Sequence, residues 1–136
     1  MTGLTVDRLG LEALALELAR ELPAGAVVRL EGPLGAGKTT FARAFVQARG
    51  ATAEATSPTY TLAHRYDGPH GEIWHLDCYR LRDPEEAADL DWDRLATADV
   101  LLIEWPERAG AWVPPASCTV RLAHAGEETR RVELQT

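Results

Sequence analysis

The pattern that most directly implies chemistry in this chain is a glycine-rich run, Gly32-Pro33-Leu34-Gly35-Ala36-Gly37-Lys38-Thr39-Thr40. Its first eight residues fit G-x-x-x-x-G-K-[ST], a loop whose backbone N–H groups bind phosphate oxygens at the start of a helix. Lys38 would reach the β- and γ-phosphates, and Thr39 would present its hydroxyl to Mg²⁺. The run therefore predicts nucleotide binding, and the residues that would surround the remaining phosphates are Gly35, Ala36, Gly37 and Thr40.

Lys38 is also unusual in the composition of the chain. It is the only lysine among 14 basic residues, and all the others are arginine. At this position of the run a compact ammonium is wanted rather than a planar guanidinium. This favours a phosphate-binding loop over an accidental glycine-rich turn.

A second candidate for the same chemistry is Glu104, which directly follows the apolar run Val100-Leu101-Leu102-Ile103. A phosphate-binding loop needs an acid at the end of a neighbouring strand to orient Mg²⁺, and this run is typical of a strand buried on both faces. Glutamate is one methylene longer than the usual aspartate, so Glu104 could bind Mg²⁺ through water or act on the attacking nucleophile. A surface glutamate at a strand end is the alternative interpretation.

The elements expected around the glycine-rich run are those that such a loop requires. Leucines recur at helical spacing over residues 8–22, which predicts an amphipathic helix that ends at Pro23 and Gly25. Residues 26–31 are a short β-type run directly before the loop, and apolar residues at helical spacing continue after it to about Gly50. The order strand, turn, helix is the one that the motif needs.

The rest of the chain consists of β-type runs and one acidic stretch. Residues 52–61 predict a loop, residues 60–66 and 72–77 a hairpin, and residues 118–123 and 129–134 a second hairpin. Asp83 with Pro84 predicts a helix start, and the acidic stretch from Asp83 to Asp99 is interpreted as a solvated helical face. We therefore expect an α/β P-loop NTPase fold, three-layer α/β/α, with a mixed parallel and antiparallel central sheet.

Composition limits the classes of protein that remain. The 136 residues are expected to form one domain, residues 1–136, and a net charge of −7 argues against a surface that grips nucleic acid as a whole. No apolar stretch approaches the ~18 residues of a membrane span, and residues 1–20 lack the pattern of a signal peptide. We expect a cytoplasmic protein without membrane contact. Cys78 and Cys118 form no CxxC pair, so reduced, partly buried thiols are expected.

Four motifs in one order give the chain a specific resemblance, and they cover nearly all of it. They are Gly35-Ala36-Gly37-Lys38-Thr39-Thr40-Phe41, Ser57-Pro58-Thr59-Tyr60-Thr61-Leu62, His75-Leu76-Asp77-Cys78-Tyr79-Arg80-Leu81 and Ile103-Glu104-Trp105-Pro106-Glu107. Together they resemble the TsaE family, bacterial ATPases required for the threonylcarbamoyladenosine modification of tRNA. Tyr60 stands where phenylalanine is frequent in the family, which leaves the expected function unchanged.

The resemblance implies roles for residues outside the glycine-rich run. Thr59 would contact the γ-phosphate from a switch-like loop, although Ser-Pro chemistry alone also fits an ordinary turn. Asp77 would orient the attacking water or a magnesium-bound water, and on an extended segment it shares one face with His75. We interpret His75 as a structural hydrogen-bonding residue, because a zinc site of His75, Asp77 and Cys78 lacks a matching second ligand pair.

Three further residues are expected near the nucleotide on the same ground. Trp105 matches a tryptophan that lies close to the nucleotide in the family, with core packing as the alternative. Glu107 would contribute an indirect contact. Arg130 belongs to a hairpin, residues 126–131, that matches a C-terminal region of the family that approaches the adenine, so the resemblance implies that it contacts the base or the ribose. The segment from Thr5 to Asp7 would form the opposite wall.

The activity implied by the resemblance is ATP binding with slow Mg²⁺-dependent hydrolysis, coupled to a conformational reset or product release. The implied partners are TsaD and TsaB, with tRNA contacted mainly through the complex and the transfer carried out on TsaD. The guanine-specificity motif of GTPases, [NT]KxD, needs a second lysine, and Lys38 is the only lysine of the chain. Guanine selection by the usual motif is therefore excluded. A small-molecule kinase, with Arg80 and Arg82 near the acceptor, and a nucleotide-gated interaction module without significant hydrolysis remain as alternatives.

Overall fold

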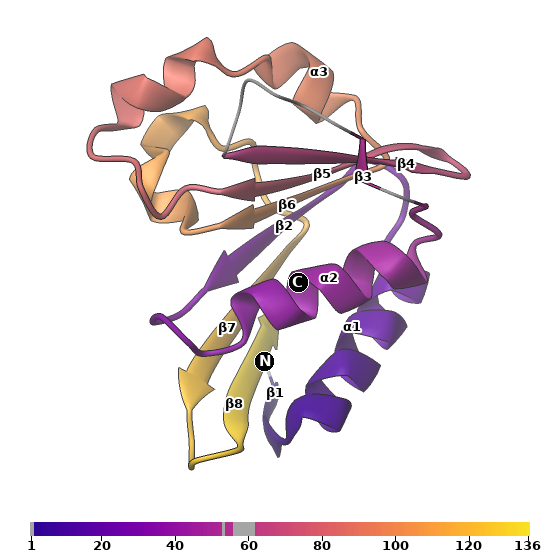
Figure 1. Ribbon diagram of the computed structural model, residues 1–136, viewed down its shortest axis with the longest axis vertical. Helices are drawn as coiled ribbons and strands as arrows, with labels where there is room; N and C mark the ends of the chain where they lie inside the picture. Colours follow the sequence, from indigo (N-terminus) through magenta and orange to yellow (C-terminus); the bar gives the residue numbers. More distant parts are fainter. Residues whose placement is uncertain (1, 53, 56–61) are drawn as a thin grey trace.

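The fold of the chain is built on one eight-stranded sheet, with the strand order β1-β8-β7-β2-β6-β5-β4-β3 (Figure 1). The computed structural model describes residues 2–52, 54–55 and 62–136. The strands are β1 (Thr2–Val6), β2 (Ala26–Glu31), β3 (Glu54–Ala55), β4 (Ala63–Gly68), β5 (Gly71–Asp77), β6 (Val100–Glu104), β7 (Cys118–His124) and β8 (Arg130–Gln135).

The centre of this sheet is parallel and its margins are antiparallel, as the sequence predicts. Strand β2 pairs in parallel with β6 and β7, and β5 pairs in parallel with β6. The hairpins β4–β5 and β7–β8 and the edge pairs β1–β8 and β3–β4 are antiparallel. Ligands of open α/β sheets bind outside the carboxyl ends of the parallel strands. The register brings Leu30, Asp77 and Glu104 level with one another at that edge.

Two helices form one of the outer layers. They are α1 (Arg8–Glu21) and α2 (Lys38–Ala48), which pack against each other and against one face of the sheet (Figure 1). Asp7 caps α1 by accepting a hydrogen bond from the backbone N–H of Gly10 at 2.8 Å. The core on this face includes Phe41 and Phe45 of α2 against alternate residues of the sheet, among them Val28 and Leu102.

Short helical segments form the other layer. They are the 3₁₀ helices η1 (Pro84–Asp89), η2 (Pro106–Arg108) and η3 (Gly110–Trp112) and the helix α3 (Trp92–Ala96). Leu101 and Ile103 of β6 point to this side, where they share a core with Leu90 and Leu95. Because β6 is covered on both faces, all five of its residues are buried. The three-layer α/β/α arrangement with a mixed sheet is confirmed.

The structure corrects the prediction for the acidic stretch and adds one strand. The stretch is not one solvated helix: Asp83 caps the 3₁₀ helix η1, and Asp99 is buried in an ion pair with Arg49 at 3.0 Å. Strand β1, at the sheet edge beside β8, was not predicted. Cys78 and Cys118 are free thiols and are fully rather than partly buried. Among the described residues, no helix has the length and apolarity that crossing a membrane requires.

Candidate functional site

A cavity of about 270 Å³ lies where the parallel strands β2, β5 and β6 end. The glycine-rich loop forms one wall of the cavity, and the segments that follow β5 and β6 form the other. The residues that line it are Leu34, Gly35, Gly37, Lys38, Thr39, Thr40, Asp77, Tyr79, Glu104, Trp105 and Arg130. We call it the P-loop cavity. It brings together most of the residues that the sequence singles out.

The loop itself adopts the conformation that its glycines predict. Gly35 and Gly37 have φ values of 74° and 103°, in the left-handed region that residues with a Cβ rarely adopt. Gly37 occupies the N-cap position of α2 without a side-chain cap. The first N–H groups of a helix have no acceptor within the helix. Those of Lys38, Thr39 and Thr40 are therefore available for an anion, which the helix dipole also attracts.

Lys38 is buried and its ammonium is held by the loop. Its Nζ donates hydrogen bonds to the carbonyl oxygens of Gly32 at 2.6 Å and Pro33 at 2.8 Å. Burial lowers the pKa of this ammonium, and the nearby carboxylates of Glu104, Asp77 and Glu107 oppose the shift. The lysine is thus a desolvated cation that donates to two carbonyl dipoles, and a phosphate would supply it with full negative charge.

Glu104 is the buried acid of the site and connects it to the sheet. The hydroxyl of Thr39 donates to its carboxylate at 3.0 and 3.1 Å, and Nε2 of His75 lies 2.6 Å from Oε2. Only 3% of Glu104 is exposed, so these contacts determine its orientation. The structural hydrogen-bonding role predicted for His75 agrees with this geometry. Glu104 is held beside Thr39, as a shared Mg²⁺ site would require.

Asp77 ends β5 directly beside Glu104 on β6. Its Oδ1 accepts a hydrogen bond from the backbone N–H of Tyr79 at 3.1 Å, which fixes the turn after the strand. The carboxylate lines the P-loop cavity and is only partly buried. Its predicted role, to orient the attacking water or a magnesium-bound water, stays a prediction.

Trp105 follows Glu104 in a strained backbone conformation. It is the only non-glycine residue of the described chain with positive φ, at 55°, and such strain is typical of functional sites. Its ring lies 4.5 Å from Nζ of Lys38 and 5.1 Å from the ring of Tyr79. The guanidinium carbon of Arg108 lies 5.0 Å from the same indole. Trp105 therefore lines the cavity rather than serving only as core packing.

The β7–β8 hairpin holds the loop from the other side. Arg130 donates to the carbonyl oxygen of Gly35 at 3.0 Å, and Nε2 of His124 lies 3.0 Å from that of Leu34. His124 and Arg130 are cross-strand partners, so one end of the hairpin contacts two consecutive loop residues. A second cavity of about 440 Å³ lies between this hairpin and the start of α1. It is lined by Asp7, Arg8, Leu9, Leu11, Gly37, Thr40, Glu127, Glu128 and Arg130.

Among the described residues, two that the sequence predicts, Ala36 and Glu107, do not line the P-loop cavity. Thr59 lies outside the described residues, so its γ-phosphate contact stays a prediction. Glu107 is exposed and lines a separate cavity beyond Tyr79, although its charge acts on Lys38. Ala36 is buried beneath the loop.

Sequence reasoning did not select three residues that the structure places at the site: Tyr79, Arg108 and His124. Tyr79 belongs to one of the quoted motifs, and Arg108 lies three residues after Trp105. An aromatic and a guanidinium close to recognised motifs were the available signals. His124 had no local signal, because its contact with the loop joins segments 90 residues apart.

The chain is similar to proteins of one known family. The family described as threonylcarbamoyl adenosine biosynthesis protein TsaE matches residues 6–132. The TsaE proteins of Haemophilus influenzae and Bacillus subtilis are 39% and 33% identical to the chain, over 79% and 94% of it and 68% and 80% of their own lengths. The crystal structure of Bacillus subtilis YdiB superposes with a TM-score of 0.73 at 29% identity, covering 96% of this chain and 83% of that one. The chain therefore belongs to the TsaE family of threonylcarbamoyladenosine biosynthesis.

Proposed function

We propose that this protein binds ATP with Mg²⁺ and hydrolyses it slowly, as a component of tRNA threonylcarbamoyladenosine biosynthesis in the cytoplasm. The observation that supports this most directly is the loop of Lys38 and Thr39, positioned beside the buried carboxylate of Glu104. The family supports the pathway.

The phosphate-binding part of the proposal rests on groups that are already turned toward the cavity. The N–H groups at the start of α2 would hold the α- and β-phosphates, with Thr40 beside them. Lys38 would exchange the carbonyls of Gly32 and Pro33 for the β- and γ-phosphates. That exchange replaces two dipole contacts with charge-assisted hydrogen bonds, which are roughly twice as strong.

The donors of the proposed metal site fit magnesium. Mg²⁺ is bound by oxygen, and the hydroxyl of Thr39 and the carboxylate of Glu104 are oxygen donors in contact with each other. Bound there, the ion would neutralise charge that develops on the phosphates. His75 would keep the carboxylate of Glu104 oriented through its 2.6 Å contact.

The remaining residues would position the reacting groups. Asp77 would orient the attacking water, and Thr59 would contact the γ-phosphate. Trp105 would close the cavity around that end of the nucleotide. Arg130 would contact the ribose or base, where the cavity between the hairpin and α1 adjoins the loop.

The proposed partners are TsaD and TsaB, with tRNA held mainly by the complex. A small chain in which Lys38 and Glu104 already make contacts within the protein is suited to hydrolysis that is slow alone and faster in a complex. The threonylcarbamoyl transfer itself would take place on TsaD. Hydrolysis would reset the complex or release its product.

Calorimetry of Mg-ATP binding to Lys38→Ala tests the nucleotide site. Charged hydrogen bonds contribute about 1.5–3 kcal/mol, so the affinity should fall roughly 10- to 150-fold. Arg43→Ala, which removes an exposed cation from the same helix, is the matched control and should bind as the wild type does. Unchanged binding by Lys38→Ala would show that the loop does not hold the phosphates.

The ATPase rate with and without the TsaD–TsaB pair tests the coupling. We expect stimulation by the pair. Absence of stimulation, together with fast phosphorylation of a small metabolite, would favour a kinase instead.

A further inference from the structure

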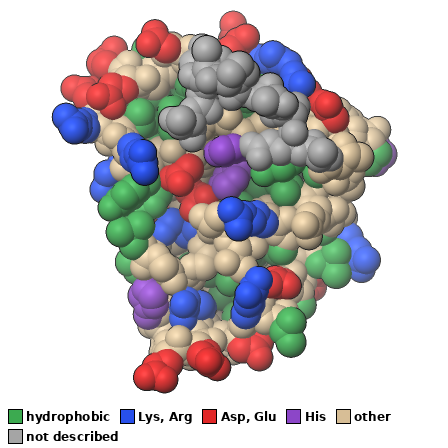
Figure 2. All heavy atoms as spheres, viewed as in Figure 1, with side chains coloured by type: hydrophobic (Ala, Val, Ile, Leu, Met, Phe, Trp, Pro, Cys, Tyr) green, Lys and Arg blue, Asp and Glu red, His purple; other side chains and the backbone are tan. Residues whose placement is uncertain are grey.

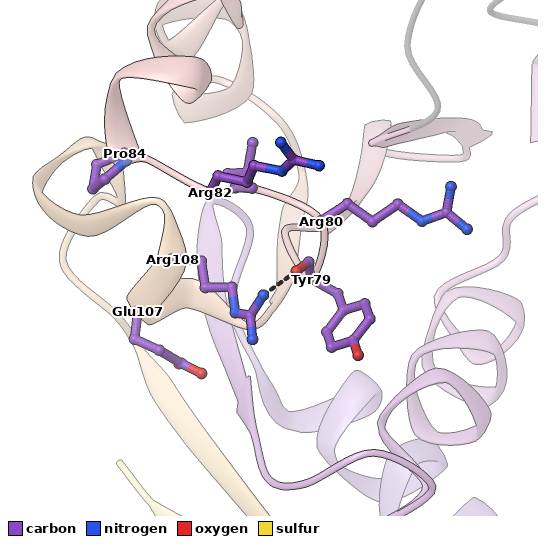
Figure 3. Close-up of a pocket in the computed structure, with 7 residues that line it drawn as sticks. Tyr79, Arg80, Arg82, Pro84, Glu107 and Arg108 are labelled. Carbon is purple, nitrogen blue, oxygen red and sulfur yellow. Dashed lines mark hydrogen bonds between the residues drawn. The ribbon is translucent and has the colours of Figure 1, made fainter.

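A third cavity, of about 750 Å³, lies beyond Tyr79 and has no part in the proposed ATPase chemistry (Figure 3). Its walls are the segment that follows β5 and the 3₁₀ helix η2 after β6. The residues that line it are Tyr79, Arg80, Leu81, Arg82, Pro84, Glu107 and Arg108. We call it the arginine cavity, because three of these residues are arginines.

These arginines differ from most others in the chain. Among the described residues, the guanidinium groups of Arg80 and Arg82 have no ion-pair or hydrogen-bond partner, and both extend in the same direction in Figure 3. Arg108 donates to the carbonyl oxygen of Tyr79 and lies over its ring at 4.9 Å. Seven of the ten other arginines form carboxylate pairs, namely Arg8, Arg29, Arg49, Arg65, Arg94, Arg121 and Arg131.

The chemistry of this cavity suits an anion that can present two oxygens to a guanidinium group. A guanidinium presents a fork of N–H groups that matches a carboxylate or a phosphate. Arg80 and Arg82 are exposed, so their forks can meet a group that arrives from solvent. The single carboxylate in the lining, Glu107, leaves the cavity with an excess of positive charge.

The surrounding charge favours a protein partner over a nucleic acid. Asp83, Glu85 and Glu86 follow Arg82 directly and are exposed, and the chain carries a net charge of −7. A phosphate backbone has closely spaced charges and needs a concentrated basic face. On the face that Figure 2 shows, acidic and basic side chains are interspersed. A short acidic segment would place one or two carboxylates on the arginines while the rest of it stays clear of these acids.

The arginine cavity adjoins the nucleotide site. Tyr79 lines both it and the P-loop cavity. The indole of Trp105 lies close to the cations of both sites, Arg108 at 5.0 Å and Lys38 at 4.5 Å. A group that binds Arg108 therefore changes the surroundings of the indole that contacts the phosphate-binding lysine.

We propose that the arginine cavity binds an acidic segment of a partner protein, with Arg80 and Arg82 holding its carboxylates. Arg108 and Trp105 connect this site to the nucleotide. The inference rests on the proposed function, because it names the surface through which the chain meets its TsaD–TsaB partner pair. Coupling between two sites is reciprocal, so ATP changes the affinity for the partner by the same factor as the partner changes that for ATP.

The test compares two double variants that carry the same change in charge. One is Arg80→Glu with Arg82→Glu; the other is Arg20→Glu with Arg43→Glu, on exposed positions of α1 and α2. Binding to the TsaD–TsaB pair is measured at low and at moderate salt, and Mg-ATP binding is measured for each chain alone. We expect the first variant to bind the pair at least about tenfold more weakly than the second, with a smaller salt dependence. Both should bind ATP as the wild type does.

Each other outcome overturns the inference. Equal affinities of the two variants for the pair would overturn the inference about the arginine cavity but leave the ATPase proposal intact. Weaker binding of tRNA by the first variant, with unchanged binding of the pair, would assign the cavity to nucleic acid instead. If the wild-type chain itself does not bind the pair, the proposed partnership fails together with the inference.

Discussion

The buried ion pair between Arg49 and Asp99 offers a quantitative test of how the fold is held behind the nucleotide site. Arg49 follows the last residue of α2, and its guanidinium forms two hydrogen bonds with the Asp99 carboxylate, at 3.0 and 3.1 Å. It also donates to the carbonyl oxygens of Ala19 and Leu22 at 2.6 Å each. One side chain thus ties the ends of α1 and α2 to the start of β6.

Arg49→Met removes every one of these hydrogen bonds while keeping a side chain of similar length. The carboxylate of Asp99 is 1% exposed, so it would be left as an uncompensated buried charge. Removal of one partner from a buried pair costs about 3–5 kcal/mol. Leu22 and Pro23 at the end of α1 are not fully buried and their carbonyl groups can regain water, so we expect the lower part of this range, about 3–4 kcal/mol. At roughly 2.1 cal/mol/K per residue, this lowers the melting temperature by about 10–14 °C.

Urea unfolding followed by tryptophan fluorescence measures the change in the free energy of unfolding. Arg20→Met, on an exposed position of α1, is the control and should stay within about 0.5 kcal/mol of the wild type. In the double variant Arg49→Met with Asp99→Asn the buried charge is gone, so it should lose less than the sum of the single changes by at least about 1 kcal/mol. A loss below about 1 kcal/mol for Arg49→Met alone would refute the reasoning.

Three further outcomes follow from the geometry. Burial lowers the pKa of Lys38 from 10.5, so the affinity for ATP should fall as the pH rises through that lowered value and the ammonium loses its charge. Calorimetry from about pH 7 to about pH 10 would detect this fall. A constant affinity would contradict the role of Lys38 as a phosphate-binding cation. Burial raises the pKa of Cys78 to about 12 and also raises the pKa of Cys118. Iodoacetamide at about pH 8 should therefore leave both thiols unmodified in the native chain and modify both in guanidinium. Mass spectrometry counts the modified cysteines. A Cβ at Gly32 would lie 2.2 Å from a backbone carbonyl of β7 at a φ of 146°, whereas one at Gly25 would meet nothing within 4 Å. In urea unfolding, Gly32→Ala should therefore lose at least about 2 kcal/mol more than Gly25→Ala, and equal losses would argue against this close approach.

The parts of the fold that the sequence predicts are those with a local pattern. The leucine spacing of residues 8–22, the strand before the glycine-rich loop and the two hairpins carry their periodicity within a few residues. Strand β1 was missed because it gains its place through pairing with β8, at the other end of the chain. The buried position of Asp99 was missed for the same reason, since its partner Arg49 is 50 residues away.

The features of the candidate site also divide into those with a local sequence pattern and those without one. Lys38 and Thr39 belong to a continuous motif, and Glu104 ends an unbroken apolar strand, so their meeting at the sheet edge was predictable. The arginine cavity was not, because it depends on the paths of the segments after β5 and β6. The φ of 55° at Trp105 sets one of those paths, and the pattern of residue types does not encode it.

The distribution of charge explains how an acidic chain can contain a site for anions. The three cavities adjoin one another. The cavity beside α1 shares Gly37, Thr40 and Arg130 with the P-loop cavity, and the P-loop cavity shares Tyr79 with the arginine cavity. Lysine and arginine side chains line all three cavities, so we call the three together the row. At physiological salt a charge is screened over about 8 Å, so a phosphate or carboxylate in the row responds to these cations more than to the net charge of −7. Lys38, Arg80, Arg82, Arg108 and Arg130 line these cavities and, within the described part of the chain, form no ion pair with a carboxylate, so an incoming anion can use them.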